Sequence, residues 1–190
     1  MAMILPVYGK DNKEVVNAYA RSLAEELVGG TTEVPVQGEY FRAIIGPKGK
    51  VLLDLRDARL GEKINDFELS GYPVRIECGE RDLQSGKCVV ASRISGEKVV
   101  IERSELATTV DHMHIQGQEM LFEASSKRLR ENTVACETLE DVGRAIEDGK
   151  FALYEWDGDP QMEIDIKERF KATTRCIPFE GHFTDDLLYL

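Results

Sequence analysis

The sequence predicts an α/β protein, and three observations support this prediction. Short apolar runs alternate with amphipathic, helix-like segments along most of the 190 residues. The stretch 74–78 places an apolar side chain at every second position, as a half-buried strand does. After a break near residue 132, a second cycle of strand and helix patterns begins. We therefore expect two domains, one over residues 1–132 and a smaller one over residues 133–190.

Glycines and prolines set most of the expected boundaries in the first domain, because they end helices and open turns. Ser95-Gly96 predicts a hairpin between two β-rich stretches. The first expected elements are a strand at 3–8, a helix from the Asp11-Asn12 cap to Gly29, with Glu14 as the partner in a capping box, and a loop with one or two short strands at 31–49. A strand at 51–55, a helix between Gly61 and Gly71, a strand at 74–78 and a turn at 79–82 are expected next. Strands at 87–93 and 98–102 and a helix from about 104 to 130 complete the domain.

The long helix at the end of the first domain carries an apolar seam at helical spacing. The seam residues are Leu106, Val110, Met113, Met120 or Leu121, and Ala124. For the second domain we expect strands at 134–136, 151–154 and 174–177, with helices at 139–146 and 162–170 between them.

Composition limits the possible functions. The chain has 42% hydrophobic and 31% charged residues, as ordinary folded proteins do. It has no run of 18 apolar residues, so we expect no membrane partner and a cytoplasmic location. Its start has no secretory pattern and reads as the middle of a longer protein. The formal net charge of −11 argues against a general nucleic-acid coat, although a compact basic patch remains compatible with it.

The cysteines and histidines predict no metal site, and the sequence contains no catalytic motif. The four cysteines, Cys78, Cys88, Cys136 and Cys176, contain no C-x-x-C pair and are expected to be reduced, several of them in the core. His112 and His114 lie two apart on one predicted helix, so they face different directions and do not share a metal. We find no nucleophile–base motif, phosphate-binding loop or dinucleotide fingerprint, and therefore expect no catalytic residue in this chain.

Acidic and basic residues are densest between residues 54 and 98. A carboxylate accepts from the N1–H and N2–H2 edge of guanine, and Arg or Lys donates to O6 and N7. Such a mixture suits the reading of unpaired bases. The alternative interpretation is a solvated sheet face with salt bridges.

One long motif favours the first interpretation. It runs through Glu68-Leu69-x-Gly71-x-Pro73-x-Arg75-x-Glu77-x-Gly79 and Asp82-Leu83. It resembles the anticodon-binding domain of prolyl-tRNA synthetases, class II enzymes, and the opening Leu5-Pro6-Val7-Tyr8 resembles that domain's first strand. Arg130-Glu131-Asn132-Thr133 and the stretch 172–179 resemble the step into, and the core of, the family's C-terminal domain. The likeness covers the chain up to Glu180 and points to the archaeal/eukaryotic-like branch.

The resemblance implies a mixed-sheet anticodon-binding domain followed by a small α/β C-terminal domain. It also implies which residues bind the anticodon of tRNA(Pro), which ends in two guanines. The matching side chains are Glu68, Arg75, Arg81, Asp82 and Lys98, with Glu97 competing for the last position. Ile64 replaces an aromatic residue that stacks under a base in relatives, and Phe67 stands at the usual tryptophan position.

Many relatives bind zinc in the C-terminal domain through four cysteines. Here Asp157 and Met162 occupy the first two matching positions, Cys176 the third, and GHFTDDLLYL replaces the segment with the last. We therefore expect no structural zinc and no other metal. Tyr189 is at best a displaced counterpart of the family's C-terminal tyrosine.

Nothing in the 190 residues matches the three motifs of a class II catalytic domain. By resemblance, the whole enzyme uses ATP and Mg²⁺ to attach proline to tRNA and dimerises through its catalytic domain, which is a further partner of this chain. The alternative hypotheses are a free-standing RNA-binding module derived from a synthetase and a small-molecule enzyme on an α/β scaffold.

Overall fold

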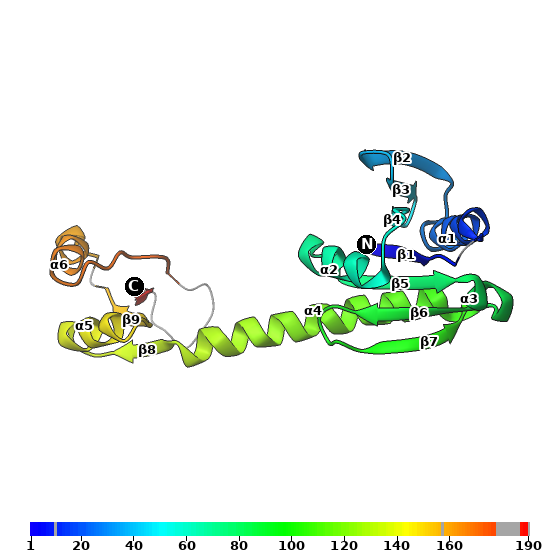
Figure 1. The fold of residues 1–190 in the computed structure, drawn as a ribbon. Coiled ribbons are helices and arrows are strands. Elements are labelled where there is room, and N and C mark those ends of the chain that lie inside the picture. The colour runs from blue at the N-terminus through cyan, green and yellow to red at the C-terminus, as the bar shows by residue number, and fades with distance from the viewer. Residues whose placement is uncertain (10, 157, 178–186, 190) are drawn as a thin grey trace. The chain divides into compact units, whose positions relative to one another are not determined.

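A computed structural model describes residues 1–9, 11–156, 158–177 and 187–189 (Figure 1). The chain divides into two compact units, residues 1–122 and residues 123–190. The division falls inside the helix Leu106–Glu131, so the expected domain boundary near residue 132 stays a prediction.

The first unit confirms the α/β class, with one seven-stranded mixed sheet and helices between its strands. The elements are β1 (Ala2–Val7), α1 (Lys13–Val28), β2 (Thr32–Gln37), β3 (Phe41–Gly46), β4 (Gly49–Asp54), α2 (Leu60–Ser70), β5 (Val74–Gly79), α3 (Glu80–Ser85), β6 (Lys87–Ser92), β7 (Lys98–Glu102), a 3₁₀ turn (Arg103–Glu105) and α4 (Leu106–Glu131).

The strand order is β2-β3-β4-β1-β5-β6-β7. β1 pairs in parallel with β4 on one side and β5 on the other, and the remaining pairs are antiparallel. The chain passes from β1 through α1 to β4 on one side of β1. It then returns through α2 to β5 on the other side of β1. Because parallel crossovers are right-handed, their helices cover opposite faces. The carboxyl ends of β1, β4 and β5 therefore meet at one edge of the sheet.

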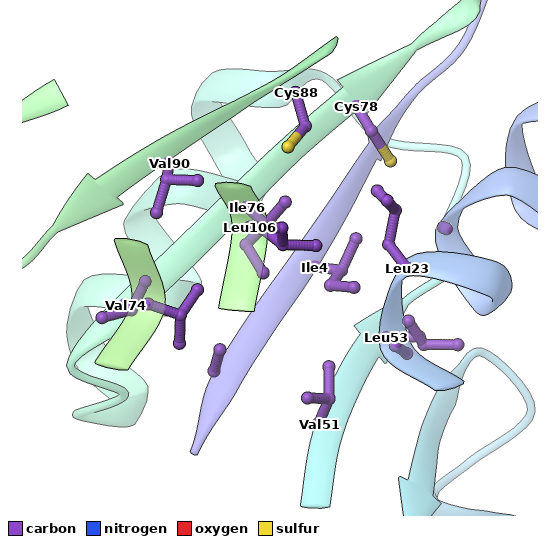
Figure 2. Close-up of a cluster of buried hydrophobic side chains, with 14 of the residues drawn as sticks. Ile4, Leu23, Val51, Leu53, Val74, Ile76, Cys78, Cys88, Val90 and Leu106 are labelled. Carbon is purple, nitrogen blue, oxygen red and sulfur yellow. The ribbon is translucent and has the colours of Figure 1, made fainter. Parts of the chain in front are cut away.

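Two apolar clusters fill the two faces, and alternation along the strands assigns each side chain to one of them. On the face covered by α1 and α4, Ile4 and Ile76 pack with Leu23 and Leu106 (Figure 2). On the other face, Phe67 of α2 packs against a smaller cluster. The strand residues of this smaller cluster are Met3, Leu5, Ala43 and Leu52.

Helix α1 begins at its predicted place but not with the expected cap. Its N-cap is Asn12, whose side chain makes no cap bond. Instead, Asn12 Oδ1 accepts from the backbone N–H of Gly9 at 2.7 Å, and Asn12 Nδ2 donates to Glu80 Oε2 at 2.8 Å. The Asp11–Glu14 box is therefore wrong, because a partner 68 residues away engages the neighbouring asparagine.

The turn expected at residues 79–82 is also wrong, since these residues open the short helix α3. The Asp82 carboxylate accepts from the Gly79 backbone N–H at 2.8 Å. An acidic residue three positions after a helix start satisfies one of the orphan donors there. That bond converts the exit of β5 into a helical turn.

Residues 31–49 form β2 and β3, which extend the sheet beyond β4. The glycines where this extension meets the end of α1 lie unusually close. A methyl group on Gly46 would stand 2.4 Å from the Val28 carbonyl oxygen and 2.8 Å from the Gly30 nitrogen. Both neighbours are backbone atoms, so neither has a side-chain rotation with which to give way.

We expect Gly46→Ala to lower the free energy of unfolding by about 2 kcal/mol or more, because overpacked sites cost about 1–3 kcal/mol. Urea unfolding followed by circular dichroism measures it. Gly61→Ala is the matched control, since its added methyl meets nothing within 4 Å on α2. That change is expected to stabilise slightly, by about 0.5–1 kcal/mol. Equal effects of the two changes would contradict the close-approach argument.

The seam predicted for the long helix is confirmed at its start, where Leu106, Val110 and Met113 are buried. It is wrong beyond Gly117, because Met120 and Leu121 are exposed. Gly117 itself lies against Ile94, and a methyl group on this glycine would stand 3.4 Å from the isoleucine side chain. The apolar spacing continues in the sequence after the sheet that the helix packs on has ended.

The second unit contains β8 (Thr133–Cys136), α5 (Leu139–Glu147), β9 (Phe151–Glu155), α6 (Pro160–Phe170) and β10 (Leu187–Tyr189). β9 pairs in parallel with β8 and antiparallel with β10. The core includes Val142 and Ile166. The strand expected at residues 174–177 is wrong: both edges of β9 are already paired, and this stretch has no extended ladder.

Several cysteines lie in the core, as expected: Cys78, Cys88 and Cys136 are buried, whereas Cys176 is exposed. Within the described residues, no helix has both the length and the apolar character that a bilayer crossing requires.

Candidate nucleic-acid interface

Charged side chains line the face of β5, β6 and β7 that lies on the α2 side of the sheet. Arg75 and Glu77 project from β5 opposite to the buried Val74, Ile76 and Cys78. In register, Arg75 lies beside Ala91 of β6, and Ala91 lies beside Lys98 of β7. The sheet thus places Arg75 and Lys98 in one cross-strand row.

Four of these side chains form a connected group, which we call the charged quartet: Glu68, Arg75, Glu77 and Lys98. Arg75 Nε donates to Glu77 Oε1 at 2.9 Å, and Arg75 Nη1 lies 3.5 Å from Glu68 Oε1. Lys98 Nζ donates to both oxygens of Glu77, at 3.1 and 2.9 Å. The quartet has two positive and two negative charges, so it is neutral as a unit.

Neighbouring residues allow this geometry. Lys98 reaches Glu77 across the intervening strand β6, at the row where β6 carries the small side chain of Ala91. The Arg75 guanidinium carbon lies 5.5 Å from the centre of the Phe67 ring. A cation over an aromatic face is attracted by the ring electrons. The buried Phe67 therefore supports Arg75 from α2.

Glu68 and Lys98 form the accessible side of the quartet, with 46% and 49% of their side chains exposed. Arg75 and Glu77 are 13% and 7% exposed. A guanidinium has five N–H donors, so two carboxylate contacts do not exhaust those of Arg75. The group therefore presents both an acceptor and donors to a planar ligand.

A hollow of about 370 Å³ lies next to the quartet, where the carboxyl ends of β1 and β5 meet. We call it the β5–α3 hollow. Its lining includes Tyr8 and Asn12 after β1, and Glu77, Arg81 and Asp82 from β5 and α3. Ligands of open α/β sheets commonly bind at this edge. Its volume is sufficient for a nucleobase.

The structure thus divides the five predicted anticodon residues between two neighbouring groups that meet at Glu77. Glu68, Arg75 and Lys98 belong to the quartet, whereas Arg81 and Asp82 line the hollow. At the position for which Lys98 and Glu97 compete, Lys98 is the residue that contacts Glu77. Whether these residues bind an anticodon stays a prediction.

Sequence reasoning omitted three residues from the predicted site: Glu77, Asn12 and Tyr8. Glu77 contacts two quartet members and lines the hollow. Its signal was its position two residues after Arg75, on the same strand face. Asn12 and Tyr8 could have been found because they follow β1, and parallel neighbours β1 and β5 end at the same edge.

Other charged residues of the dense region 54–98 have structural contacts. Lys63 is fully buried and donates to the backbone oxygens of Pro6 and Asp54 at 2.9 and 3.1 Å, where β1 and β4 end. Burial lowers the pKa of Lys63 to about 8, although the Asp54 carboxylate opposes that shift. Arg56 donates to the carboxylates of Asp54 and Asp66. These groups fix strand ends beside the site.

The second unit does not supply a zinc-binding set at the described positions. Met162 packs against its apolar core, and Cys176 is exposed. Structural zinc requires four closely placed Cys or His ligands. Among the described residues, no group of three or more His, Cys, Asp and Glu is arranged to hold a metal ion. Asp157 and residues 178–186 lie outside the described residues, so the absence of zinc stays a prediction.

Residues 1–113 match the family model described as "Anticodon binding domain". The chain therefore belongs to the family of anticodon-binding domains. Residues 139–187 match a second model, "Prolyl-tRNA synthetase, C-terminal". Together, the two parts correspond to the C-terminal region of prolyl-tRNA synthetases, as the motifs predicted.

Curated relatives support the same assignment over nearly the whole chain. The proline–tRNA ligase of Pyrococcus abyssi is 32% identical over 178 residues, which are 93% of this chain and 34% of that protein. The proline–tRNA ligase of Rubrobacter xylanophilus is 34% identical over 189 residues, 98% of this chain and 36% of that protein. The chain thus spans about a third of the length of these relatives. Because they include an archaeon and a bacterium, the branch of the family stays a prediction.

Proposed function

We propose that this chain recognises the anticodon of tRNA(Pro) for a proline–tRNA ligase. The observation that carries the proposal is the charged quartet beside the β5–α3 hollow. It combines the accessible carboxylate of Glu68 with the cations of Arg75 and Lys98 on one supported sheet face. Two adjacent guanines present the complementary donors and acceptors when they are unpaired in a loop.

The roles of the predicted residues follow from their chemistry. Glu68 and Asp82 are expected to accept from the N1–H and N2–H2 edges of guanine. Arg75, Arg81 and Lys98 are expected to donate to O6 and N7, or to neighbouring phosphates. Because the quartet is neutral and the chain carries −11, the local geometry must provide the discrimination. A broad electrostatic field does not.

The whole enzyme of which such a region is part would attach proline to tRNA in an ATP- and Mg²⁺-dependent reaction. Its catalytic domain would be a partner of this chain in the same polypeptide, and the enzyme would work as a cytoplasmic homodimer without zinc in the C-terminal domain. The named activity of the curated relatives and their extra length support this proposal. A free-standing RNA-binding module is less well supported, because residues 139–187 match a prolyl-tRNA synthetase model and the relatives named above are proline–tRNA ligases.

Arg75→Met tests the proposal directly. We expect the unchanged chain to prefer an anticodon stem–loop with two guanines over one in which either guanine is adenine. The substitution should cost about 1–3 kcal/mol of that preference, or about fivefold to 150-fold in the affinity ratio. Methionine keeps a long side chain over Phe67 and leaves Glu77 paired with Lys98. Fluorescence anisotropy with labelled stem–loops gives both affinities.

Arg103→Met is the matched control. Arg103 likewise donates from Nε to a glutamate, Glu26, at 2.8 Å and lies 5.6 Å from an aromatic ring centre, that of Tyr19. Tyr19 belongs to the cluster on the opposite face of the sheet. This control should leave the ratio of the two affinities unchanged. Equal binding of all stem–loops by the unchanged chain would refute the proposed function.

A further inference from the structure

We infer that Glu77 is a positioning residue for guanine discrimination: its buried carboxylate holds Arg75 and Lys98 so that they donate to a base edge instead of following phosphates. This inference rests on the proposed function and adds to it a role for Glu77, which the motif contains but to which neither the motif nor the family match assigned a role. The Glu77 side chain is only 7% exposed, and in this role it acts through its two partners.

The contacts of Glu77 are those of a two-sided clamp. On one side its Oε1 accepts from Arg75 Nε on the same strand, at 2.9 Å. From the other side the Lys98 ammonium of β7 bonds to both of its oxygens. A carboxylate has about four lone-pair positions, so three donors leave it nearly saturated. Glu77 is therefore committed to its two cations.

The clamp fixes side chains that would otherwise be mobile. The Lys98 side chain is 49% exposed and crosses the width of β6 to reach Glu77. A long unpaired lysine on a sheet surface samples many rotamers, and binding a ligand would have to order it. With Glu77 in place, that ordering is complete before the RNA arrives. Arg75 is ordered similarly, between Glu77 and the Phe67 ring.

The clamp also limits non-specific attraction. Two free cations on this face would bind any phosphate backbone, because that attraction does not depend on sequence. Paired with Glu77, and with Glu68 close to Arg75, they form a neutral group. A neutral group gains little from phosphates. It still offers directional donors to a base that meets it in the correct plane.

Glu77 also stands where the two halves of the predicted site meet. It bonds two quartet residues and lines the hollow that contains Arg81 and Asp82. A bridge between strands that served packing alone would be replaceable by apolar side chains, since buried ion pairs often add little stability. A clamp that serves discrimination would not be replaceable, and this difference can be measured.

Glu77→Gln in the 190-residue chain is the decisive variant, because glutamine keeps the shape and one acceptor oxygen but removes the charge. We expect the preference for a two-guanine stem–loop over its adenine-substituted counterpart to fall by roughly tenfold or more. Affinity for the substituted stem–loop should stay the same or increase. The slope of log affinity against log salt should steepen by up to about one.

Glu102→Gln is the matched control. Glu102 pairs with Lys87 at 3.2 Å across β6 and β7, with both side chains about half exposed and neither in the quartet. The Glu102→Gln substitution changes the net charge by the same amount as Glu77→Gln. Because Glu102 lies outside the quartet, this control should leave the preference for the two-guanine stem–loop intact. A folded Glu77→Gln chain that keeps the preference within about twofold, or that weakens both stem–loops equally, would overturn the inference.

Glu77→Asp covers the case in which the glutamine variant fails to fold. It keeps the negative charge but is one methylene shorter, so it reaches one cation better than the other. We expect an intermediate preference with a normal salt slope; an unchanged preference would overturn the inference. If the unchanged chain itself shows no preference, the proposed function fails and the inference fails with it. This outcome can be told apart from a failure of the inference alone, because the unchanged chain would then bind both stem–loops equally before Glu77 is altered.

Discussion

Replacing Phe67 with alanine is expected to lower the free energy of unfolding of the first unit by about 3–5 kcal/mol, the usual cost of removing a buried aromatic ring. Phe67 is fully buried on the α2 face of the sheet, where it packs with Met3, Leu5 and Leu52. Its ring also lies under the Arg75 guanidinium and supports it. The truncation would leave a cavity that rigid strands cannot close.

Urea unfolding followed by circular dichroism measures this loss. Phe122→Ala is the control on α4, where the ring is 70% exposed. It should change stability by less than about 0.5 kcal/mol. A loss below about 1 kcal/mol for Phe67→Ala would show that the α2 face is not closely packed. In folded Phe67→Ala, the two-guanine preference should also weaken, because Arg75 loses its support.

The second large effect is expected in alkaline solution, where the two buried thiols of the first unit oppose the buried amine of Lys63. Burial raises the pKa of the Cys88 thiol to about 11, and it raises the pKa of the Cys78 thiol far above its usual range. Both sulfurs lie in the cluster of Figure 2. An unfolded thiol ionises near pH ~8.5, so above that value the unfolded state loses protons that the folded state keeps. Stability therefore falls with rising pH.

Lys63 acts in the opposite direction. Its pKa is about 8 in the folded chain because of burial, against about 10.4 when unfolded. Between these values the unfolded state holds the extra proton, so stability rises with pH. From pH 8 to pH 10 the two thiols are expected to remove about 4 kcal/mol and Lys63 to add about 2 kcal/mol. The net loss from these three groups is about 2 kcal/mol.

Variants separate the two contributions. With a phosphine reductant present, Cys78→Ala combined with Cys88→Ala should reverse the trend, so that stability rises by about 1–2 kcal/mol over this range. Lys63→Met should steepen the loss to about 4 kcal/mol. Denaturant unfolding at several pH values gives these slopes, and the slope is the readout because each substitution also shifts absolute stability. Parallel curves for all three proteins would contradict the assigned burial effects.

Local patterns predicted most of the fold. Alternation at 74–78 predicted β5 and the opposite faces of Arg75 and Ile76, because side-chain direction in a strand follows from its own geometry. Gly29 and Gly71 ended α1 and α2 in left-handed conformations, as glycine permits. Predictions of local structure were wrong where a contact with a residue far away in the sequence determined the conformation. Asn12 is the N-cap residue of α1, but its side chain bonds Glu80 and makes no cap bond to the helix.

The same division applies to the candidate site. The sequence by itself determined the family, the α/β class and the charged residues of the site, since each depends on residue identity and short spacing. Tertiary structure decided which charges share one surface: Lys63 is buried at strand ends, whereas Lys98 crosses β6 to join Glu77 and Arg75. The physical reason is that strand order and register bring residues 21 positions apart into contact. No local pattern contains that information.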